Sequence, residues 1–291
     1  MQHTTKWMMT PLAMLLGTLF SAPSFAVETS VIDSTSTPES TQNEGDTSCI
    51  VCKFSGAVYL SYDTNIYDKD DYRSVRNFSW GGDLVYSFSS DTKAYFSTGG
   101  YRALEDEVGT YATDSVLGLQ YTNLYRFGDT GKIGVAGQLT IPTSETSRKD
   151  ELHTAVRLDV PISFSAWSVD FSVSPRLRKN FHEYKTMGGR SLTEWTYSLF
   201  AVAEKSWESF AVGGITALGG NSISYQGTRR SSWQYEGGAL YGTYEFDESW
   251  SLLLAASSTG FYQDAERGTL GNIDLLDQEK ASYIVTVTYS F

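Results

Sequence analysis

Apolar and polar residues alternate with a period of two from Phe54 to the last residue of the chain. The last segment shows this most clearly, because its apolar side chains occupy every second position: Ala281, Tyr283, Val285, Val287, Tyr289 and Phe291. The positions between them are mostly Ser or Thr. Successive side chains of a β-strand point to opposite faces of a sheet, so the pattern predicts a strand with two unlike faces. The segment 151–165 likewise has Leu152, Val156 and Phe164 opposite His153 and Arg157.

Twelve segments of this kind can be counted, and together they predict an all-β fold. Their approximate ranges are 54–64, 76–89, 92–102, 112–127, 131–142, 151–165, 167–178, 191–204, 207–218, 230–246, 249–261 and 280–291. Connections of two or three residues alternate with long ones at 65–75, 103–111, 143–150, 179–190, 219–229 and 262–279. An even strand number with all long connections at one end is typical of a twelve-stranded antiparallel transmembrane β-barrel, with short periplasmic turns and long extracellular loops.

Aromatic residues and one break in the alternation add detail to this picture. Trp167, Trp207 and Trp250 each follow a tight turn, where amphipathic rings would lie at one membrane interface. In the segment 230–246 the apolar positions change from odd to even across Gly237–Gly238. This change predicts a β-bulge, which would turn Glu236 inward.

The first 53 residues are of a different kind from the rest. Lys6, the apolar run 12–20 and Ser24-Phe25-Ala26 have the order of a secretory signal peptide, so we expect cleavage after Ala26. The following stretch to Ser48 is nearly all Ser, Thr, Asp and Glu, which is typical of a linker. We therefore divide the chain into a signal peptide (1–26), a periplasmic linker (27–53) and a barrel (54–291). A periplasmic partner that docks on the linker is the alternative to a plain tether.

Composition excludes several classes of protein. The chain has 291 residues, 14% of them aromatic, with a formal net charge of −12. The aromatic content excludes a disordered chain, and the acidic balance argues against nucleic-acid binding. The absence of an apolar run of about 20 residues excludes a membrane-spanning helix but leaves β-strands, which need only ~9–11 residues each.

These features identify a resemblance to Gram-negative outer-membrane β-barrel proteins. The signal peptide, the twelve segments and the final Tyr289-Ser290-Phe291 carry it. The resemblance implies a location in the outer membrane, contact with the lipid bilayer and lipopolysaccharide, and recognition of the C-terminal strand by the barrel-assembly machinery. Twelve-stranded members of this class include solute-specific channels, autotransporter translocators, a phospholipase and the omptin proteases.

Strand parity places charged residues inside the predicted barrel on two walls. The basic wall, on the fourth to seventh segments, carries Arg126, Lys132, Arg157, Arg176 and Arg178, with Asp114, Asp159 and Asp170 among them. The acidic wall, on the other segments, carries Asp63, Asp83, Glu194, Glu204, Glu236 and Glu245, with Lys93. Opposed walls would set a transverse field across a water-filled pore. The alternative is that the charges pair within a filled interior.

We therefore expect an outer-membrane channel for passive diffusion of small polar or charged solutes, since no P-loop motif is present to drive transport. The alternative is a non-conducting barrel with a structural or surface-interaction role through its extracellular loops. An enzyme is not expected. After signal cleavage only His153 and His182 remain as histidines, and no local segment resembles the omptin catalytic segments.

Cys49 and Cys52 precede the first predicted strand, and an oxidising periplasm favours a disulfide between them. A redox-active or partner-reactive pair is the other interpretation. Lys53 follows Cys52 where a c-type haem would need His, and two thiols alone do not complete a zinc site. We therefore expect no cofactor and no metal. Acidic clusters in the loops, such as Asp68, Asp70 and Asp71, are expected to be solvated surface.

Overall fold

The computed structural model describes residues 53–105, 108–227, 229–231, 234–261 and 281–291. Within them the elements are β1 (Phe54–Thr64), β2 (Arg76–Ser87), β3 (Thr92–Ala103), β4 (Gly109–Ala112), β5 (Ser115–Phe127), β6 (Gly131–Ile141), α1 (Glu145–Lys149), β7 (Leu152–Asp159), β8 (Ile162–Ala166), β9 (Val169–His182), β10 (Thr186–Met187), β11 (Arg190–Ser191), β12 (Thr193–Ser206), β13 (Phe210–Ser224), β14 (Arg229–Ser231), β15 (Gln234–Glu245), β16 (Trp250–Phe261) and β17 (Ala281–Ser290).

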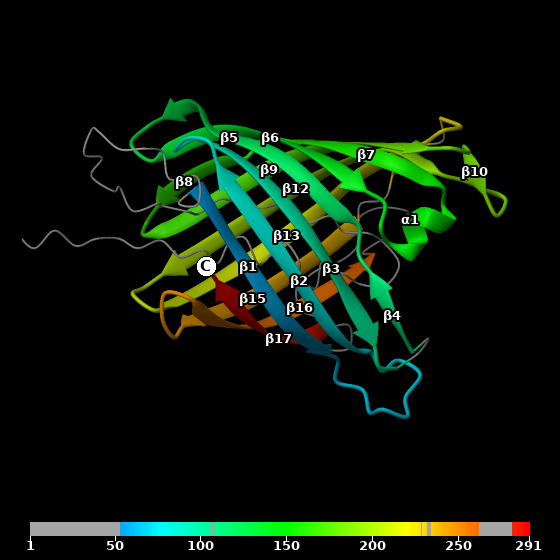
Figure 1. The fold of residues 1–291 in the computed structure, drawn as a ribbon, viewed down its shortest axis with the longest axis horizontal. Coiled ribbons are helices and arrows are strands. Elements are labelled where there is room, and N and C mark those ends of the chain that lie inside the picture. The colour runs from blue at the N-terminus through cyan, green and yellow to red at the C-terminus, as the bar shows by residue number, and fades with distance from the viewer. Residues whose placement is uncertain (1–52, 106–107, 228, 232–233, 262–280) are drawn as a thin grey trace, which may run out of the picture.

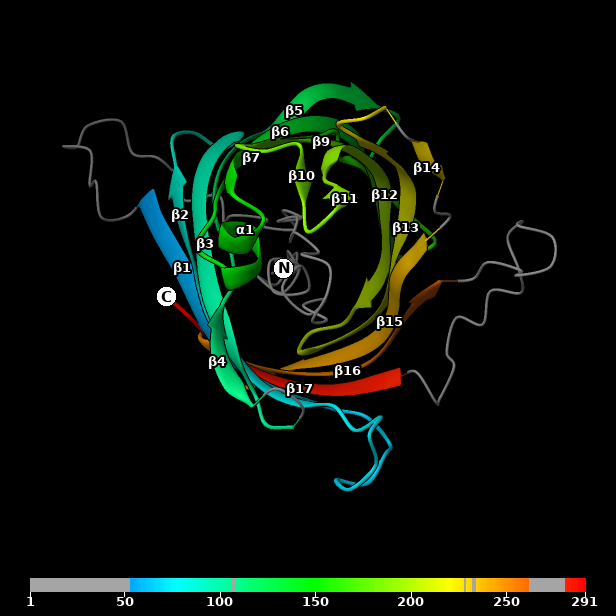
Figure 2. The ribbon, with the colours of Figure 1, turned by 90° about the vertical axis from the view of Figure 1, so that its right-hand side faces the viewer.

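The long strands close into a twelve-stranded antiparallel barrel (Figures 1 and 2). Around the ring the order is β1, β2, β3, β5, β6, β7 with β8, β9, β12, β13, β15, β16 and β17, and β17 pairs with β1. The broken strand β7–β8 pairs with β6 on one side and β9 on the other. The predicted all-β fold and its strand number are therefore confirmed.

Tight turns and long connections alternate around the barrel as expected. The tight turns 88–91, 128–130, 167–168, 207–209 and 246–249 lie at one end. The other end has the 65–75 loop, β4, α1 and the small hairpin β10–β11. In the view along the barrel, α1 and β10–β11 lie inside the outline of the ring (Figure 2). Among the described residues, no helix is long and apolar enough to cross a membrane.

Strand parity separates the two faces of the wall. On β1 and β17 the outward positions carry exposed apolar side chains: Val58, Leu60, Tyr62, Tyr283, Val285, Val287 and Tyr289. The positions between them face inward, and Ser61 on β1 hydrogen-bonds Thr286 on β17 at 2.8 Å. The apolar face is therefore on the outside, which is the reverse of a water-soluble sheet protein.

Two irregularities interrupt the long strand expected at 151–165. The strand breaks at Val160–Pro161, because Pro161 has no N–H to donate to the ladder. A register shift between Leu152 and Thr154 leaves His153 as an extra residue opposite β9. The shift also buries Leu152, so its expected place on the face of Val156 was wrong.

The bulge predicted near Gly237–Gly238 is confirmed. The register shifts by one residue between Tyr235 and Gly238 against β16, and between Ala217 and Leu218 against β15. Trp167, Trp207 and Trp250 also lie at the tight-turn end as expected, and all three rings are exposed.

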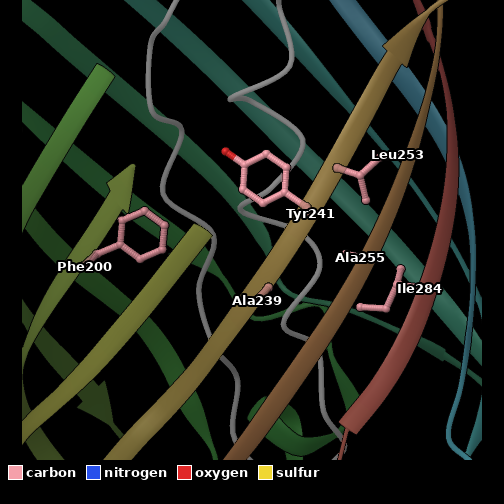
Figure 3. Packing of buried hydrophobic residues seen from close by; sticks show 6 residues of the cluster. All are labelled: Phe200, Ala239, Tyr241, Leu253, Ala255 and Ile284. Atoms are coloured by element: carbon pink, nitrogen blue, oxygen red, sulfur yellow. The ribbon is translucent and has the colours of Figure 1, made fainter. Parts of the chain in front are cut away.

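The core of the barrel lies on the inner face of its wall. One apolar cluster joins β12, β15, β16 and β17 and consists of Phe200, Ala239, Tyr241, Leu253, Ala255 and Ile284 (Figure 3). A second cluster joins β2, β3 and β5 through Val85, Tyr95 and Val116. Among the described residues, each cluster extends along nearby strands of the wall, so it stabilises the wall locally.

Candidate channel interior

Three arginines and one aspartate meet on the inner face of β7 and β9; we refer to them as the arginine cluster. The register sets Arg157 opposite Arg178 and Asp159 opposite Arg176. Nε of Arg157 lies 3.1 Å from the Asp159 carboxylate, and Nε of Arg176 lies 4.0 Å from it. The cluster as defined contains three bases and one acid.

Neighbouring strands hold the arginine cluster in place. The Arg176 guanidinium carbon lies 4.1 Å from the centre of the Phe200 ring on β12, a cation–π contact. Nε of Arg178 donates to Asn180 Oδ1 at 2.6 Å. Arg157 and Asp159 are each 4% exposed and Arg176 is 8% exposed. Charges buried to this extent need partners, and the ion pairs with Asp159 supply part of that need.

The other two predicted bases lie apart from the arginine cluster. Arg126 and Lys132 are directly opposite each other on β5 and β6, next to the tight turn 128–130. Arg126 is exposed and donates from Nε to Asn123 Oδ1 at 2.7 Å. These two side chains therefore mark the tight-turn mouth and not the middle of the barrel.

Asp63 and Asp83 lie on the inner face of β1 and β2. The Asp63 carboxylate accepts from Asn77 Nδ2 at 2.8 Å. Asp83 is buried and accepts a hydrogen bond from the Ser97 hydroxyl on β3. Both acids therefore have neutral hydrogen-bond donors from the adjacent strand.

A second group of acids lies at the tight-turn end of β9, β12 and β15. Glu204 stands directly opposite Asp170, and its Oε2 accepts from the Tyr241 hydroxyl at 2.6 Å. Glu245 is paired in register with Ser251 at the end of β15. The Asp170 carboxylate accepts from the Ser165 hydroxyl. This group of acids therefore lies nearer the tight-turn end than Arg176 and Arg178, which share β9 with Asp170.

Glu194 is placed differently from the other acids. It is the extra residue at a register shift between Thr193 and Trp195. Its carboxylate lies 3.2 Å from Nζ of Lys179, which stacks on the Trp195 ring at 4.5 Å. Lys179 belongs to the outward row of β9, so this ion pair draws Glu194 to the rim near the long-loop end.

Three of the predicted site residues are not described by the structure. Cys49 and Cys52 lie outside the described residues, and the side chain of Glu236 on β15 is likewise not described. The expected disulfide and the expected inward orientation of Glu236 stay predictions.

Sequence reasoning did not single out the aromatic residues that complete the inner wall. Phe200, Tyr241 and Tyr95 all occupy inward positions, so the parity of their strands was the available signal. The Tyr95 hydroxyl reaches Gln138 on β6, which lies beside Arg157 in the register. The inner wall therefore has aromatic rings next to polar and charged side chains.

The long-loop mouth is organised by side chains from several loops. Ser144 caps α1, and its N–H donates to Asp114 Oδ1 at 2.8 Å. Arg190 of β11 lies 3.5 Å from Asp150, which caps the other end of α1. Asp114 was assigned to the basic wall, and here it anchors α1 at the mouth.

His153 and His182 lie at the same mouth. His153 Nε2 is 3.9 Å from Glu183, and the His182 ring Nδ1 is 3.3 Å from the Tyr225 hydroxyl. That hydroxyl donates to the Asn180 carbonyl at 2.6 Å and accepts from the His182 N–H. These bonds tie the end of β9 to the loop after β13. Within the part of the chain that the structure describes, no group of three His, Cys, Asp or Glu could hold a metal.

Comparison with known proteins finds similarity in fold alone. No protein-family model matches the chain, and no curated protein matches it. Among solved structures, the NanC porin is 10% identical with a TM-score of 0.52, over 80% of this chain and 98% of that one. An outer membrane channel from Pseudomonas putida F1 is 14% identical with a TM-score of 0.53, over 82% of this chain and 95% of that one. The chain therefore has a closed twelve-stranded antiparallel β-barrel whose fold resembles these two outer-membrane barrels.

Proposed function

We propose that the protein is an outer-membrane channel through which small polar or charged solutes diffuse passively. The observation that carries this proposal is the arginine cluster on the inner face of a closed barrel whose outer face is apolar. Three arginines and one aspartate therefore face inward on two adjacent strands, and holding charges at buried positions costs free energy unless other groups compensate them. A pore that attracts charged solutes gives such a cluster a use.

The outer surface supports a place in a membrane. The barrel strands that are not interrupted have 10 to 15 residues, enough to cross a bilayer at a tilt. Their outward rows are apolar, and Trp167, Trp207 and Trp250 lie together at the tight-turn end. We place this end at the periplasm, with lipopolysaccharide around the long loops. The outward Tyr283, Val285, Val287 and Tyr289 of β17 would be the signal for the barrel-assembly machinery.

The charges would select solutes through the field that they set in a low-dielectric wall. Positive charge concentrates on β7 and β9, whereas acids lie on β1, β2 and β12. A solute with separated charges would be attracted and turned as it passes. No chemical step is required of any residue, which agrees with a non-enzymatic function.

The direct test is the current through the refolded chain, residues 27–291, in a planar bilayer with a salt gradient. We expect steady single-channel currents and a reversal potential that indicates a preference for anions. Arg178→Glu reverses one charge of the arginine cluster and should shift the reversal potential toward cations. Arg102→Glu is the matched control, because Arg102 is exposed and lies on the outward row of β3.

Absence of current from well-folded protein would overturn the channel and favour the alternative function. One observation supports that alternative, a surface-interaction role. The 65–75 loop is held by a bidentate ion pair between Arg73 and Asp71 and by the Arg76–Glu105 pair. It presents Tyr72, which is 89% exposed. Equal reversal potentials for the Arg178 and Arg102 variants would leave a channel but remove the role of the arginine cluster.

A further inference from the structure

Two short elements at the long-loop end lie inside the outline of the barrel without being part of its wall. The helix α1 joins β6 to β7, and the β10–β11 hairpin joins β9 to β12 (Figure 2). Among the described strands, β10 and β11 pair only with each other, as a small sheet separate from the barrel. The backbone ladders that fix the wall therefore do not fix the position of this hairpin.

The helix α1 is anchored to the wall at its N-terminal end. The Asp114 carboxylate, next to the start of β5, accepts from the Ser144 N–H at 2.8 Å and from the Ser147 hydroxyl. Ser147 is buried, and its N–H donates to the Ser144 hydroxyl at 3.1 Å. The Ser115 N–H donates to the Thr143 hydroxyl at 2.9 Å, which holds the chain just before the helix. Several hydrogen bonds therefore keep α1 in one place.

The hairpin is fixed at its base, and its body extends inward from the wall (Figure 2). The Leu192 N–H donates to the Lys185 carbonyl at 3.0 Å, and the Leu192 carbonyl accepts from the Tyr225 N–H at 3.1 Å. Leu192 is also buried. Beyond this base the hairpin turns through Gly188 and Gly189, which are exposed and have φ values of +56° and +78°. Its body can therefore move about Leu192 while the strand pairing of the barrel stays intact.

One ion pair links the body of the hairpin to the anchored helix. Nη2 of Arg190 on β11 lies 3.5 Å from Oδ1 of Asp150, the residue that caps the C-terminal end of α1. The Asp150 N–H donates to the Thr146 carbonyl at 2.9 Å, so the helix holds this acid in position. The side chains of Arg190 and Asp150 are 67% and 24% exposed. An ion pair that reaches solvent in this way is weak, and salt screens it.

We propose that α1 and the β10–β11 hairpin form a two-part lid at the long-loop mouth, closed by the ion pair between Arg190 and Asp150. In this lid α1 is the fixed part and the hairpin is the moving part. Loss of the ion pair lets the hairpin swing away from α1 about Leu192, which widens the mouth. This inference rests on the proposed function, since a lid matters only to a barrel that conducts.

The test measures the current through the refolded chain, residues 27–291, and through its Arg190→Gln variant in a planar bilayer. At low salt we expect the variant to carry about 2- to 5-fold more mean current with fewer closures, because an exposed ion pair shifts an equilibrium by about this factor. The difference should shrink as salt rises, since salt also weakens the pair in the unmodified chain.

Two further variants separate the ion pair from the loss of a charge at the mouth. Lys185→Gln removes the same charge from the base of the same hairpin, where Lys185 is exposed, and it should conduct like the unmodified chain. The charge swap Asp150→Arg/Arg190→Asp restores the pair and should return the current toward that of the unmodified chain. Equal currents from Arg190→Gln and Lys185→Gln would overturn the lid and leave the channel in place.

A second measurement tests the lid even if no variant conducts, an outcome that would overturn the channel itself. Trypsin should cut after Lys185 at least ~2-fold faster in Arg190→Gln and in Asp150→Asn than in the unmodified chain, because a released hairpin opens more often. Heat-modifiable mobility on gels confirms that each variant folds. Equal rates of cutting in the three folded proteins would show that the ion pair does not hold the hairpin.

Discussion

Inward tyrosines that lie over glycines are the clearest contacts at the scale of single residues. The Tyr95 ring covers Gly118 on β5, and the Tyr241 ring covers Gly213 on β13. In each case the hydroxyl reaches the strand beyond, where it meets Gln138 or Glu204. A side chain in place of the glycine would occupy the space of the ring, so these glycines allow an aromatic ring to lie flat along the wall.

Gly118→Ala should therefore destabilise the barrel by about 1–3 kcal/mol, the usual cost of overpacking. A Cβ at this position would overlap the Tyr95 ring. Gly137→Ala on the neighbouring strand is the control, because a Cβ there meets nothing within 4 Å. Urea unfolding followed by tryptophan fluorescence measures both changes. The same loss of stability in both variants would show that the ring contact does not matter.

A pH effect is expected in the 65–75 loop, outside the membrane-spanning strands. Arg73 donates from Nε and Nη2 to the Asp71 carboxylate at 3.1 and 2.8 Å, and its backbone N–H donates at 2.9 Å. The side-chain bonds, followed by the backbone bond, lower the pKa of Asp71 to about 2 from its ordinary value of 3.8. Because the pKa is lowered on folding, the contact between Asp71 and Arg73 contributes its full stability above pH 3.8. That contribution is lost as the pH falls through about 2, where Asp71 becomes protonated.

Carbon-detected NMR titration of Asp71 measures this directly in detergent micelles. Arg73→Gln should return the pKa of Asp71 toward its ordinary value, whereas Arg76→Gln, which removes the pair with Glu105, should leave it low. An Asp71 pKa that does not respond to Arg73→Gln would contradict the assigned cause.

At the scale of elements, the hairpin between β8 and β9 turns through an unusual pair of residues. Trp167 and Ser168 have φ values of +53° and +60°. Positive φ at both loop positions is the requirement of a type I′ turn, which fits the twist of paired strands and normally carries Asn-Gly. A bulky residue with a positive φ has a strained backbone. Trp167 has this conformation, and its ring is 89% exposed.

Ser168→Gly should stabilise the barrel by roughly 0.5–1 kcal/mol, because glycine adopts positive φ without a steric cost. Ser168→Ala retains the Cβ and should give no gain, which makes it the matched control. The midpoint of urea unfolding compares the two. Equal midpoints for glycine and alanine would indicate that the turn carries no strain.

Irregular strands limit prediction at this scale. Pro161 is visible in the sequence as a residue that cannot donate to a ladder, and the strand breaks there. The shift at His153 has no such local signal, since it depends on how β7 aligns with β9. The bulge in β15 did have a local signal, its glycines, because glycine weakens a regular strand and allows an extra residue to be inserted.

At the scale of the whole molecule, closure depends on the first and last strands. Gly56 and Phe291 exchange two backbone hydrogen bonds of 3.0 and 2.9 Å. The Phe291 ring also lies against Gly56, where a Cβ would come within 2.7 Å of ring carbon and of the Asp83 carbonyl oxygen. The seam, where β1 meets the C-terminal end of the chain, therefore has no room for a side chain at Gly56.

Gly56→Ala should reduce the yield of closed barrel during refolding. The two strands at this seam are furthest apart in the sequence, so the entropic cost of bringing them together is the largest and we expect them to pair last. Gly214→Ala is the control, because its Cβ would make only ordinary contacts. The folded fraction is read from heat-modifiable mobility on gels. Equal folded fractions would show that the seam tolerates the added carbon.

The sequence by itself determined the class of fold and the face on which each regular position lies. Both follow from an alternation of two, which is a local property of a strand: it makes Tyr283 outward and Thr286 inward wherever the strand is placed. The tight turns followed from the same pattern, because alternation stops where the chain reverses.

Only the tertiary structure decided which inward residues meet. Arg157 and Arg178 are 21 positions apart, and their contact depends on a register set by hydrogen bonds between strands. Arg126 and Arg176 have the same inward parity in the sequence. In the structure, however, Arg126 lies at the mouth and Arg176 lies against Phe200 in the interior. Glu194 was drawn toward Lys179 by a shift in pairing that no local pattern marks. Parity specifies a side of the wall, whereas the level of a residue within the barrel follows from the stagger of every strand before it.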